Sequence, residues 1–310
     1  MAISKYQGIT WSSPGAFYLS KIWSLYCREL DWDFQLCNLG YHGLPDPIFG
    51  DGNPNPDLLA FHPQDGDLQH IHIRPCEAID NSSDPDSDIE HLESCFENSH
   101  ESSAVSAQEV RDYLSGRGYD FIPDIQEIVI VLPNSVYDKH GSFIDREINE
   151  RDFILWLVES NGNVAIWKEK GSHSNLNLDR EISTEMKAYP SSNDLLQYTR
   201  STDRDRLKFE FISRLVRNAG RNNKLRFEFE EVDEIMVSTH PPILGHIPKE
   251  TRVEEYWGDF LYSMLNTFGL IEQTENPNEY EWTKEKFANE PRYPHRILEN
   301  IRDDLEIEGA

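Results

Sequence analysis

The spacing of apolar residues in the first half of the chain predicts alternating helices and strands. Apolar residues at helical spacing follow Pro14 and predict an opening helix over residues 14–30. The segments PDLLAF (56–61) and LQHIHIRPC (68–76) are short apolar runs joined by a turn that contains glycine. They predict two neighbouring strands.

Further segments extend this pattern to residue 171. The run EIVIVLP is apolar without a break, which suits a strand covered on both faces. The remaining elements are predicted as a strand over 33–41, a loop over 40–56, a helix over 106–119, a strand over 127–136, a helix over 149–162 and a strand over 163–171. Their order predicts an α/β fold with a mixed sheet flanked by helices.

Two polar segments divide the chain. Residues 78–106 are rich in Asp, Glu and Ser, and they predict an acidic insert with one short helix over 88–96. Residues 172–204 show no sustained period and predict a linker between domains. The first domain is therefore expected to span residues 1–171.

Beyond the linker, the pattern predicts a second, smaller domain over residues 205–290. Its expected elements are a helix over 205–220, a strand over 224–230, a helix over 230–239, a longer helix over 248–269 and a hairpin over 270–283. Residues 291–310 are expected to form a C-terminal tail.

Composition adds a strong negative charge to this picture. The 310 residues are 38% hydrophobic and 11% aromatic, as in globular proteins, and are enough for two domains. Acidic residues number 56 against 29 basic ones, a net charge of -27, and arginines outnumber lysines. This composition resembles that of proteins from halophilic archaea. Because concentrated salt shortens the Debye length to about 3 Å, the charge does not exclude DNA binding.

The chain lacks the signals of several other classes. It has no basic segment followed by a continuous apolar core, so we expect a soluble cytoplasmic protein with no membrane partner. No glycine-rich phosphate loop is present, and no nucleotide cofactor is expected. The irregular spacing of the four cysteines predicts buried thiols rather than disulfides or a thiolate zinc site; they are Cys27, Cys37, Cys76 and Cys95.

The first domain resembles the PD-(D/E)XK (restriction-endonuclease-like) superfamily, on the helix, the PDLLAF strand and the LQHIHIRPC strand. In that family the Asp after Pro binds a divalent metal, and the next strand carries an acid, one apolar residue and a Lys. The resemblance places Asp57 as the metal ligand, His72 at the second acid and Arg74 at the Lys, with Glu29 on the opening helix as an additional acid.

The two departures from the family pattern weaken the expected chemistry. Mg²⁺ prefers hard oxygen ligands, and the imidazole of His72 shifts the preference toward Mn²⁺ or Zn²⁺. Arg74 keeps a positive charge for a phosphate oxygen, but its guanidinium cannot accept a proton. The resemblance therefore implies a degenerate site: a metal-dependent nuclease using Mg²⁺ or Mn²⁺ if active, and more readily an inactive domain.

Two other interpretations of the histidines stay open. His70 and His72 share one face of a strand, and with Glu77 they approximate the first ligand set of a cupin metal site. The cupin glycines are missing, and the predicted helices do not belong in a cupin barrel. The same two histidines are also explained by the solvent face of an edge strand with no metal.

The second domain resembles a winged helix in the order helix, strand, helix, helix, hairpin. For DNA binding, Lys249 and Arg252 would contact phosphates. The spacing of Trp257 indicates a core position, and stacking on a base is the alternative. The acidic residues Glu254, Glu255 and Asp259 occur in the same stretch, which makes a protein-binding winged helix equally reasonable. We expect a nucleic-acid-associated protein that binds DNA or a protein; the alternatives are a noncatalytic interaction protein and a metal enzyme using His70, His72 and Glu77.

Overall fold

The computed structural model separates the chain into two compact units. It describes residues 14–26, 36–49, 55–76, 79, 84–102, 105–161, 163–188, 198–200, 202–222, 225–239, 242–283 and 295–305. The larger unit is Phe17–Leu195, and the smaller unit combines Leu196–Ala310 with Met1–Ala16. Among the described helices, none has both the length and the apolar character needed to cross a bilayer.

The larger unit is built on a mixed sheet of seven strands in sequential order. Its two central pairs, β3 with β4 and β4 with β5, are parallel, and the outer pairs are antiparallel. The strands are β1 (His42–Pro45), β2 (Leu58–His62), β3 (Asp67–Ile73), β4 (Ile125–Pro133), β5 (Ile154–Asn161), β6 (Asn163–Lys170) and β7 (Met186–Ala188). The predicted α/β fold with a mixed sheet flanked by helices is confirmed.

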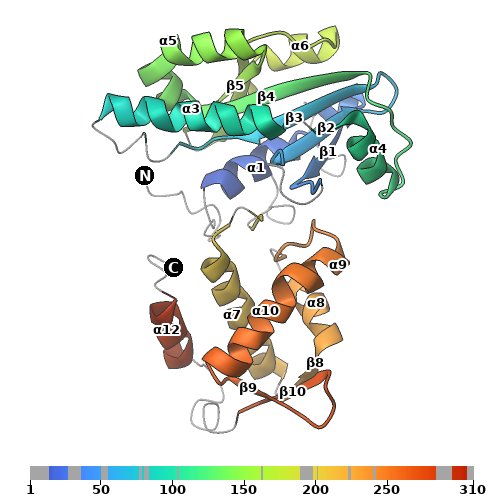
Figure 1. The fold of residues 1–310 in the computed structure, drawn as a ribbon, viewed down its shortest axis with the longest axis vertical. Helices are drawn as coiled ribbons and strands as arrows, with labels where there is room; N and C mark the ends of the chain where they lie inside the picture. The colour runs from blue at the N-terminus through green and yellow to red at the C-terminus, as the bar shows by residue number, and fades with distance from the viewer. Residues whose placement is uncertain are drawn as a thin grey trace. The chain divides into compact units, whose positions relative to one another are not determined.

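Helices close one face of this sheet with two apolar clusters. One cluster joins α3 and α5 to β4 and β5, and the other joins α4 to β2. Figure 1 shows α3 crossing the sheet on this face. The helices on this face are α3 (Pro85–Ser102), α4 (Ala107–Ser115) and α5 (Asn134–Arg151), and the unit also contains α1 (Pro14–Ser24) and α6 (Leu176–Ile182). α4 begins as predicted, with a reciprocal capping box between Ser106 and Glu109.

Several predicted elements are different in the structure. Residues 149–162 were expected to be a helix, but the end of α5 and strand β5 occupy them. A short apolar run suits a buried helix and a buried strand equally, and here Ile154, Leu155 and Trp156 are covered on both sides of the sheet. The strand predicted over 33–41 is wrong for residues 36–39, which form a 3-10 helix (Leu36–Leu39), and β1 lies within the predicted loop.

The two polar segments also carry regular structure. The expected short helix of the acidic insert is α3, which has 18 residues and buries Leu92 and Phe96 in the core. The expected linker contains α6 and β7, and β7 completes the sheet. A few apolar residues on one face can anchor a mostly polar helix in the core. The high polar content of these two segments therefore hid their regular structure from a reading based on composition.

The smaller unit contains every element type predicted for residues 205–283. Its strands form an antiparallel sheet in the order β8, β10, β9. The elements are α7 (Arg204–Asn222), β8 (Arg226–Glu228), α8 (Phe229–Ser238), a helical run over 249–267 that alternates α and π turns and includes α9 (Lys249–Arg252) and α10 (Gly258–Tyr262), β9 (Ile271–Gln273), β10 (Glu279–Trp282) and α12 (His295–Asp304). Phe211, Trp257 and Phe260 pack together at its centre.

Candidate functional site

Asp57 and Arg74 meet at the ends of two neighbouring strands. Asp57 directly precedes β2, Arg74 directly follows β3, and the antiparallel register of the two strands brings them together. The Oδ2 atom of Asp57 accepts a hydrogen bond from the backbone N–H of Ile73 at 2.7 Å and one from Nη1 of Arg74 at 3.0 Å. The pair is largely enclosed, since about a fifth of the Arg74 side chain and a quarter of the Asp57 side chain are exposed.

The guanidinium of Arg74 links this pair to His72 and to α3. Its Nη2 atom donates to Oγ of Ser99 at 3.0 Å and lies 3.2 Å from Nδ1 of His72. Ser99 in turn donates to the carbonyl oxygen of Cys95, one helical turn earlier, at 2.8 Å. Arg74 therefore connects β2, β3 and α3 through its fixed planar set of donors.

Burial determines the protonation of the two histidines. Desolvation, with the nearby charge of Arg74, lowers the pKa of His72 well below its usual value. Neutral His72 can therefore accept a hydrogen bond from Arg74 at Nδ1. Desolvation also lowers the pKa of His70 to about 4, and the side chain of Gln126 offsets this only in part. Neither ring nitrogen of His70 makes a hydrogen bond of regular geometry to the residues that the structure describes.

Asp57 is shifted in the opposite direction. Burial raises its pKa above the usual value, and the charge of Arg74 and the N–H of Ile73 offset only part of this effect. The carboxylate of Asp46 raises the pKa further. Arg74 is therefore the main group that favours the ionised form of Asp57.

This arrangement leaves little chemistry available at Asp57. One carboxylate oxygen, Oδ2, already accepts two hydrogen bonds, and one of them comes from a permanent cation. The remaining partners of Arg74 are His72 and Ser99, which carry no carboxylate. Asp46 is the carboxylate whose charge acts on Asp57. Glu29 and Glu77 lie outside the described residues, so the additional acid and the third cupin ligand receive no position here.

The two alternative interpretations of the histidines do not fit the sheet. β3 is the third of seven strands and not an edge, and both His70 and His72 are fully buried on the face beneath the helices. The solvent-face interpretation is therefore wrong. An open sheet of sequential strands flanked by helices is also not a cupin barrel.

Within the described part of the chain, one group of His, Cys, Asp or Glu side chains has ligand atoms close enough to share a metal ion. It consists of Cys76, His91 and Cys95, whose ligand atoms all lie within 4.8 Å of one another. A hydrogen bond with Cys76 lowers the pKa of the Cys95 thiol to about 6, against the effect of burial, and the charges of His91 and Arg74 act in the same direction. The group contains none of the predicted metal ligands.

The opposite face of the sheet carries a buried polar network that the sequence analysis did not predict. Nδ1 of His173 lies 2.6 Å from a carboxylate oxygen of Glu127, and its Nε2 accepts from the indole N–H of Trp156 at 3.1 Å. Gln69 lies 3.4 Å from the same Nδ1 and accepts from the hydroxyl of Tyr26 at 3.1 Å. Both ring nitrogens of His173 are occupied, which is the arrangement of a structural histidine.

In the smaller unit, two of the three predicted nucleic-acid contacts are buried. Arg252 pairs with both carboxylate oxygens of Asp233 at 2.8 Å, and the indole N–H of Trp257 donates to the same carboxylate at 2.8 Å. Arg252 is 6% exposed and Trp257 is fully buried. The prediction that Arg252 contacts a phosphate does not hold in this conformation, whereas the burial of Trp257 agrees with the core position that its spacing indicates. Lys249, at the start of α9, is exposed as expected.

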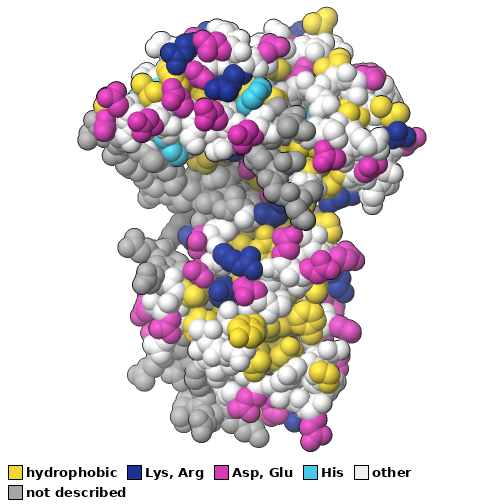
Figure 2. Space-filling model, viewed as in Figure 1, with side chains coloured by type: hydrophobic (Ala, Val, Ile, Leu, Met, Phe, Trp, Pro, Cys, Tyr) yellow, Lys and Arg dark blue, Asp and Glu magenta, His cyan; other side chains and the backbone are white. Residues whose placement is uncertain are grey.

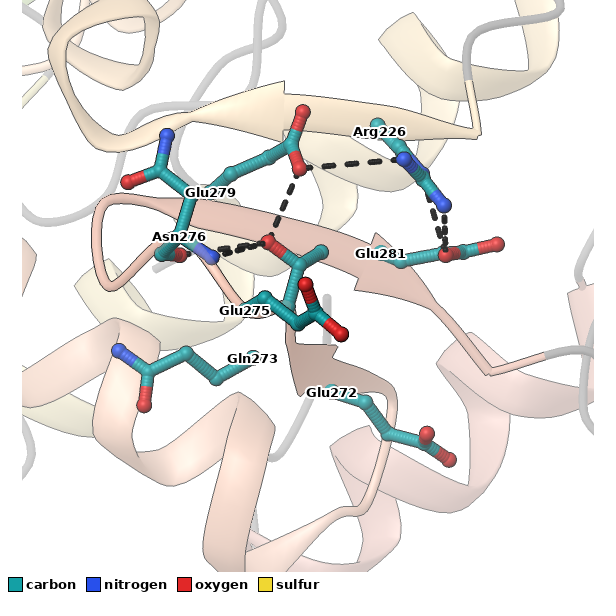
Figure 3. Close-up of a pocket in the computed structure, with 8 residues that line it drawn as sticks. Arg226, Glu272, Gln273, Glu275, Asn276, Glu279 and Glu281 are labelled. Carbon is teal, nitrogen blue, oxygen red and sulfur yellow. Dashed lines mark hydrogen bonds and ion pairs between the residues drawn. The ribbon is translucent and has the colours of Figure 1, made fainter.

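The hairpin of the smaller unit borders an acidic hollow of about 600 Å³. Figure 3 shows Arg226 of β8 beside Glu279 and Glu281 of β10, while Glu272 and Glu275 lie at the hairpin. The Arg226 guanidinium lies 2.8 Å from Glu281 and 3.9 Å from Glu279. Four glutamates against one arginine leave this surface negative. Figure 2 shows acidic side chains spread over the visible face of each unit.

Comparison of the chain with known protein families, with curated proteins and with solved structures gives no match.

Proposed function

We propose that the larger unit is a noncatalytic domain of the PD-(D/E)XK type, and that the protein works by docking to a partner. The order of its elements supports the proposal, because α1 precedes three antiparallel strands, and α3 and α4 precede a strand parallel to β3. The two half-motifs named in the sequence also lie together, since Asp57 and Arg74 are in contact. The proposed domain keeps the fold of this family but lacks its catalytic activity.

The single observation that carries the loss of catalysis is the pairing of Asp57 with Arg74. A Mg²⁺ ion needs near-octahedral oxygen ligands, and Oδ2 of Asp57 already accepts from the Arg74 guanidinium and the Ile73 N–H, so an ion at this carboxylate would lie beside a permanent cation. Nη1 of Arg74 lies 3.0 Å from Oδ2 of Asp57, so its guanidinium would repel a divalent cation bound to this carboxylate. The guanidinium cannot be deprotonated to relieve the repulsion. His72 is neutral and buried, so it supplies neither a second negative charge nor a base exposed to water.

The smaller unit supports docking to a protein rather than to a nucleic acid. Its order helix, strand, helix, helix, hairpin is that of a winged helix, in which the third helix and the hairpin usually form the contact surface. Here Glu254, Glu255 and Asp259 are exposed on the third helix. With the glutamates of the hairpin, they would repel a phosphate backbone and attract a basic protein surface.

The experiment is a plasmid-nicking assay with a matched site variant. Supercoiled plasmid is incubated with the full chain in Mg²⁺ or Mn²⁺, at low and at molar KCl, beside Asp57→Asn. We expect no nicking by either protein under any of these conditions. Nicking by the unaltered protein that Asp57→Asn abolishes would refute the loss of catalysis.

A gel-retention assay tests the choice of partner separately. We expect duplex DNA to migrate unretarded with the full chain at about 0.1 M KCl, where electrostatic binding is strong. Retention that Lys249→Glu weakens would favour DNA as the partner through the third helix.

A further inference from the structure

Three soft ligands meet where β3 leads into α3. Cys76 follows the end of β3, and His91 and Cys95 lie four residues apart on α3. Residues at this spacing share one face of a helix, so both side chains can turn toward the same point. One ligand atom from each of the three residues lies within 4.8 Å of the other two.

The backbone on both sides of this group is held in place. Cys76 adopts a φ of 51°, in the left-handed region that residues other than glycine rarely occupy, and its carbonyl accepts from the N–H of Ile79 at 3.0 Å. On α3, Leu92 and Phe96 are buried in the core, which fixes the rotation of the helix. The ligands therefore belong to two anchored segments, which lowers the conformational entropy that a bound ion would have to remove.

The chemistry of the donors selects the ion. Two cysteine sulfurs and one imidazole nitrogen are soft and borderline ligands, which favour Zn²⁺ over the hard ions Mg²⁺ and Mn²⁺. Two thiolates neutralise the charge of Zn²⁺, and this suits a site in which Cys76 is buried and Cys95 is half-buried. His91 is exposed, so a water molecule can reach the fourth tetrahedral position.

We propose that Cys76, His91 and Cys95 bind one Zn²⁺, with water as the fourth ligand, and that the ion fastens α3 to the end of β3. Binding replaces the S–H bonds of the two thiols with S–Zn bonds and releases their protons to the buffer. The site uses none of the groups that hold Asp57. It therefore stands or falls independently of the proposed loss of nuclease chemistry.

The first measurement is zinc content under reducing conditions. The untagged full chain is purified with a phosphine reductant, loaded with Zn²⁺, desalted and analysed for metal per chain. We expect one Zn²⁺ per chain, with affinity lowered more than about tenfold in Cys95→Ser and His91→Gln. Cys37→Ser, which removes a buried thiol outside the group, and His100→Gln, which changes another exposed histidine of α3, should retain the metal.

Two further readouts identify the ligands and keep the test valid if one variant misfolds. Co²⁺ in place of Zn²⁺ should give a sulfur-to-cobalt charge-transfer band and the intense visible bands of a tetrahedral site, and the exposed change His91→Gln should weaken them without unfolding the chain. Zinc should also slow amide exchange in α3 by at least about tenfold, as a ligand that binds the folded state does.

Three results would overturn the proposal. The first is no zinc retained by the reduced, folded chain, and the second is equal retention in the Cys95→Ser and Cys37→Ser variants. The third is a disulfide between Cys76 and Cys95 in protein whose thiols were alkylated at the moment of cell lysis.

Discussion

Replacing Arg74 with methionine should destabilise the larger unit by about 2–4 kcal/mol. The change removes the hydrogen bonds of the guanidinium to Asp57, Ser99 and His72 and leaves the Asp57 carboxylate with the N–H of Ile73. Removing one partner of a fully buried ion pair costs about 3–5 kcal/mol. The loss expected for Arg74→Met, about 2–4 kcal/mol, is smaller than for a fully buried pair because a quarter of the Asp57 side chain is exposed.

The pH dependence of this loss has a definite sign. Arg74 is the largest of the groups that lower the pKa of Asp57, so without it the folded-state pKa of this acid rises further above the unfolded value. An acid with a raised folded pKa binds its proton more tightly when folded. The variant should therefore recover stability as the pH falls through that pKa, and the difference from the unaltered protein should be largest near neutral pH.

Amide hydrogen exchange of β4 measures this loss within the larger unit, because an unfolding transition of a two-unit chain need not be two-state. Arg180→Met, a change at an exposed position of α6, serves as the control and should stay within about 0.5 kcal/mol. The double variant Asp57→Asn, Arg74→Met should be less destabilised than the two single effects predict, with a coupling above about 1 kcal/mol. Additive effects, or a loss below about 0.5 kcal/mol for Arg74→Met, would refute the pairing as described.

Three further predictions test other parts of the structure. Asp233→Ala should cost about 3–5 kcal/mol in urea denaturation of the smaller unit, because it leaves the buried Arg252 without its carboxylate; a loss under about 1 kcal/mol would contradict that burial. The pKa of His70 is lowered in the folded state, so the free energy of unfolding should fall by up to about 3 kcal/mol as the pH drops from about 6.5 toward 4. Denaturation measured across that pH range should show a smaller loss for His70→Leu. An equal slope in both proteins would exclude His70 as its source. Ser106→Ala should cost about 1 kcal/mol, measured as faster amide exchange at the start of α4, and unchanged exchange would show that the capping box contributes little.

The two neighbouring strands predicted over 56–61 and 68–76 show what short-range sequence patterns can provide. Two strands joined by a tight turn must be antiparallel neighbours, so the residue before the first lies close to the residue after the second. Ser99, which accepts a hydrogen bond from Arg74, could not be predicted in the same way. It lies on α3, where a mostly polar sequence concealed a helix anchored by Leu92 and Phe96.

The error in the smaller unit has a similar cause. A basic residue on a third helix suits a DNA contact, which predicts an exposed position for Arg252. Its partner, Asp233, lies 19 residues earlier on another helix, and no local sequence pattern indicates that pair. The group of Cys76, His91 and Cys95 was missed for a related reason, since its first member is brought to α3 by the fold and not by a short sequence spacing.

The most direct test of the occupied Asp57 site is a crystal of the full chain soaked in Mn²⁺, with diffraction recorded at a wavelength where manganese scatters anomalously. We expect no anomalous peak beside Asp57 and a guanidinium of Arg74 within hydrogen-bonding distance of its carboxylate. A manganese peak on that carboxylate, with Arg74 turned away, would show that Asp57 binds metal in place of Arg74.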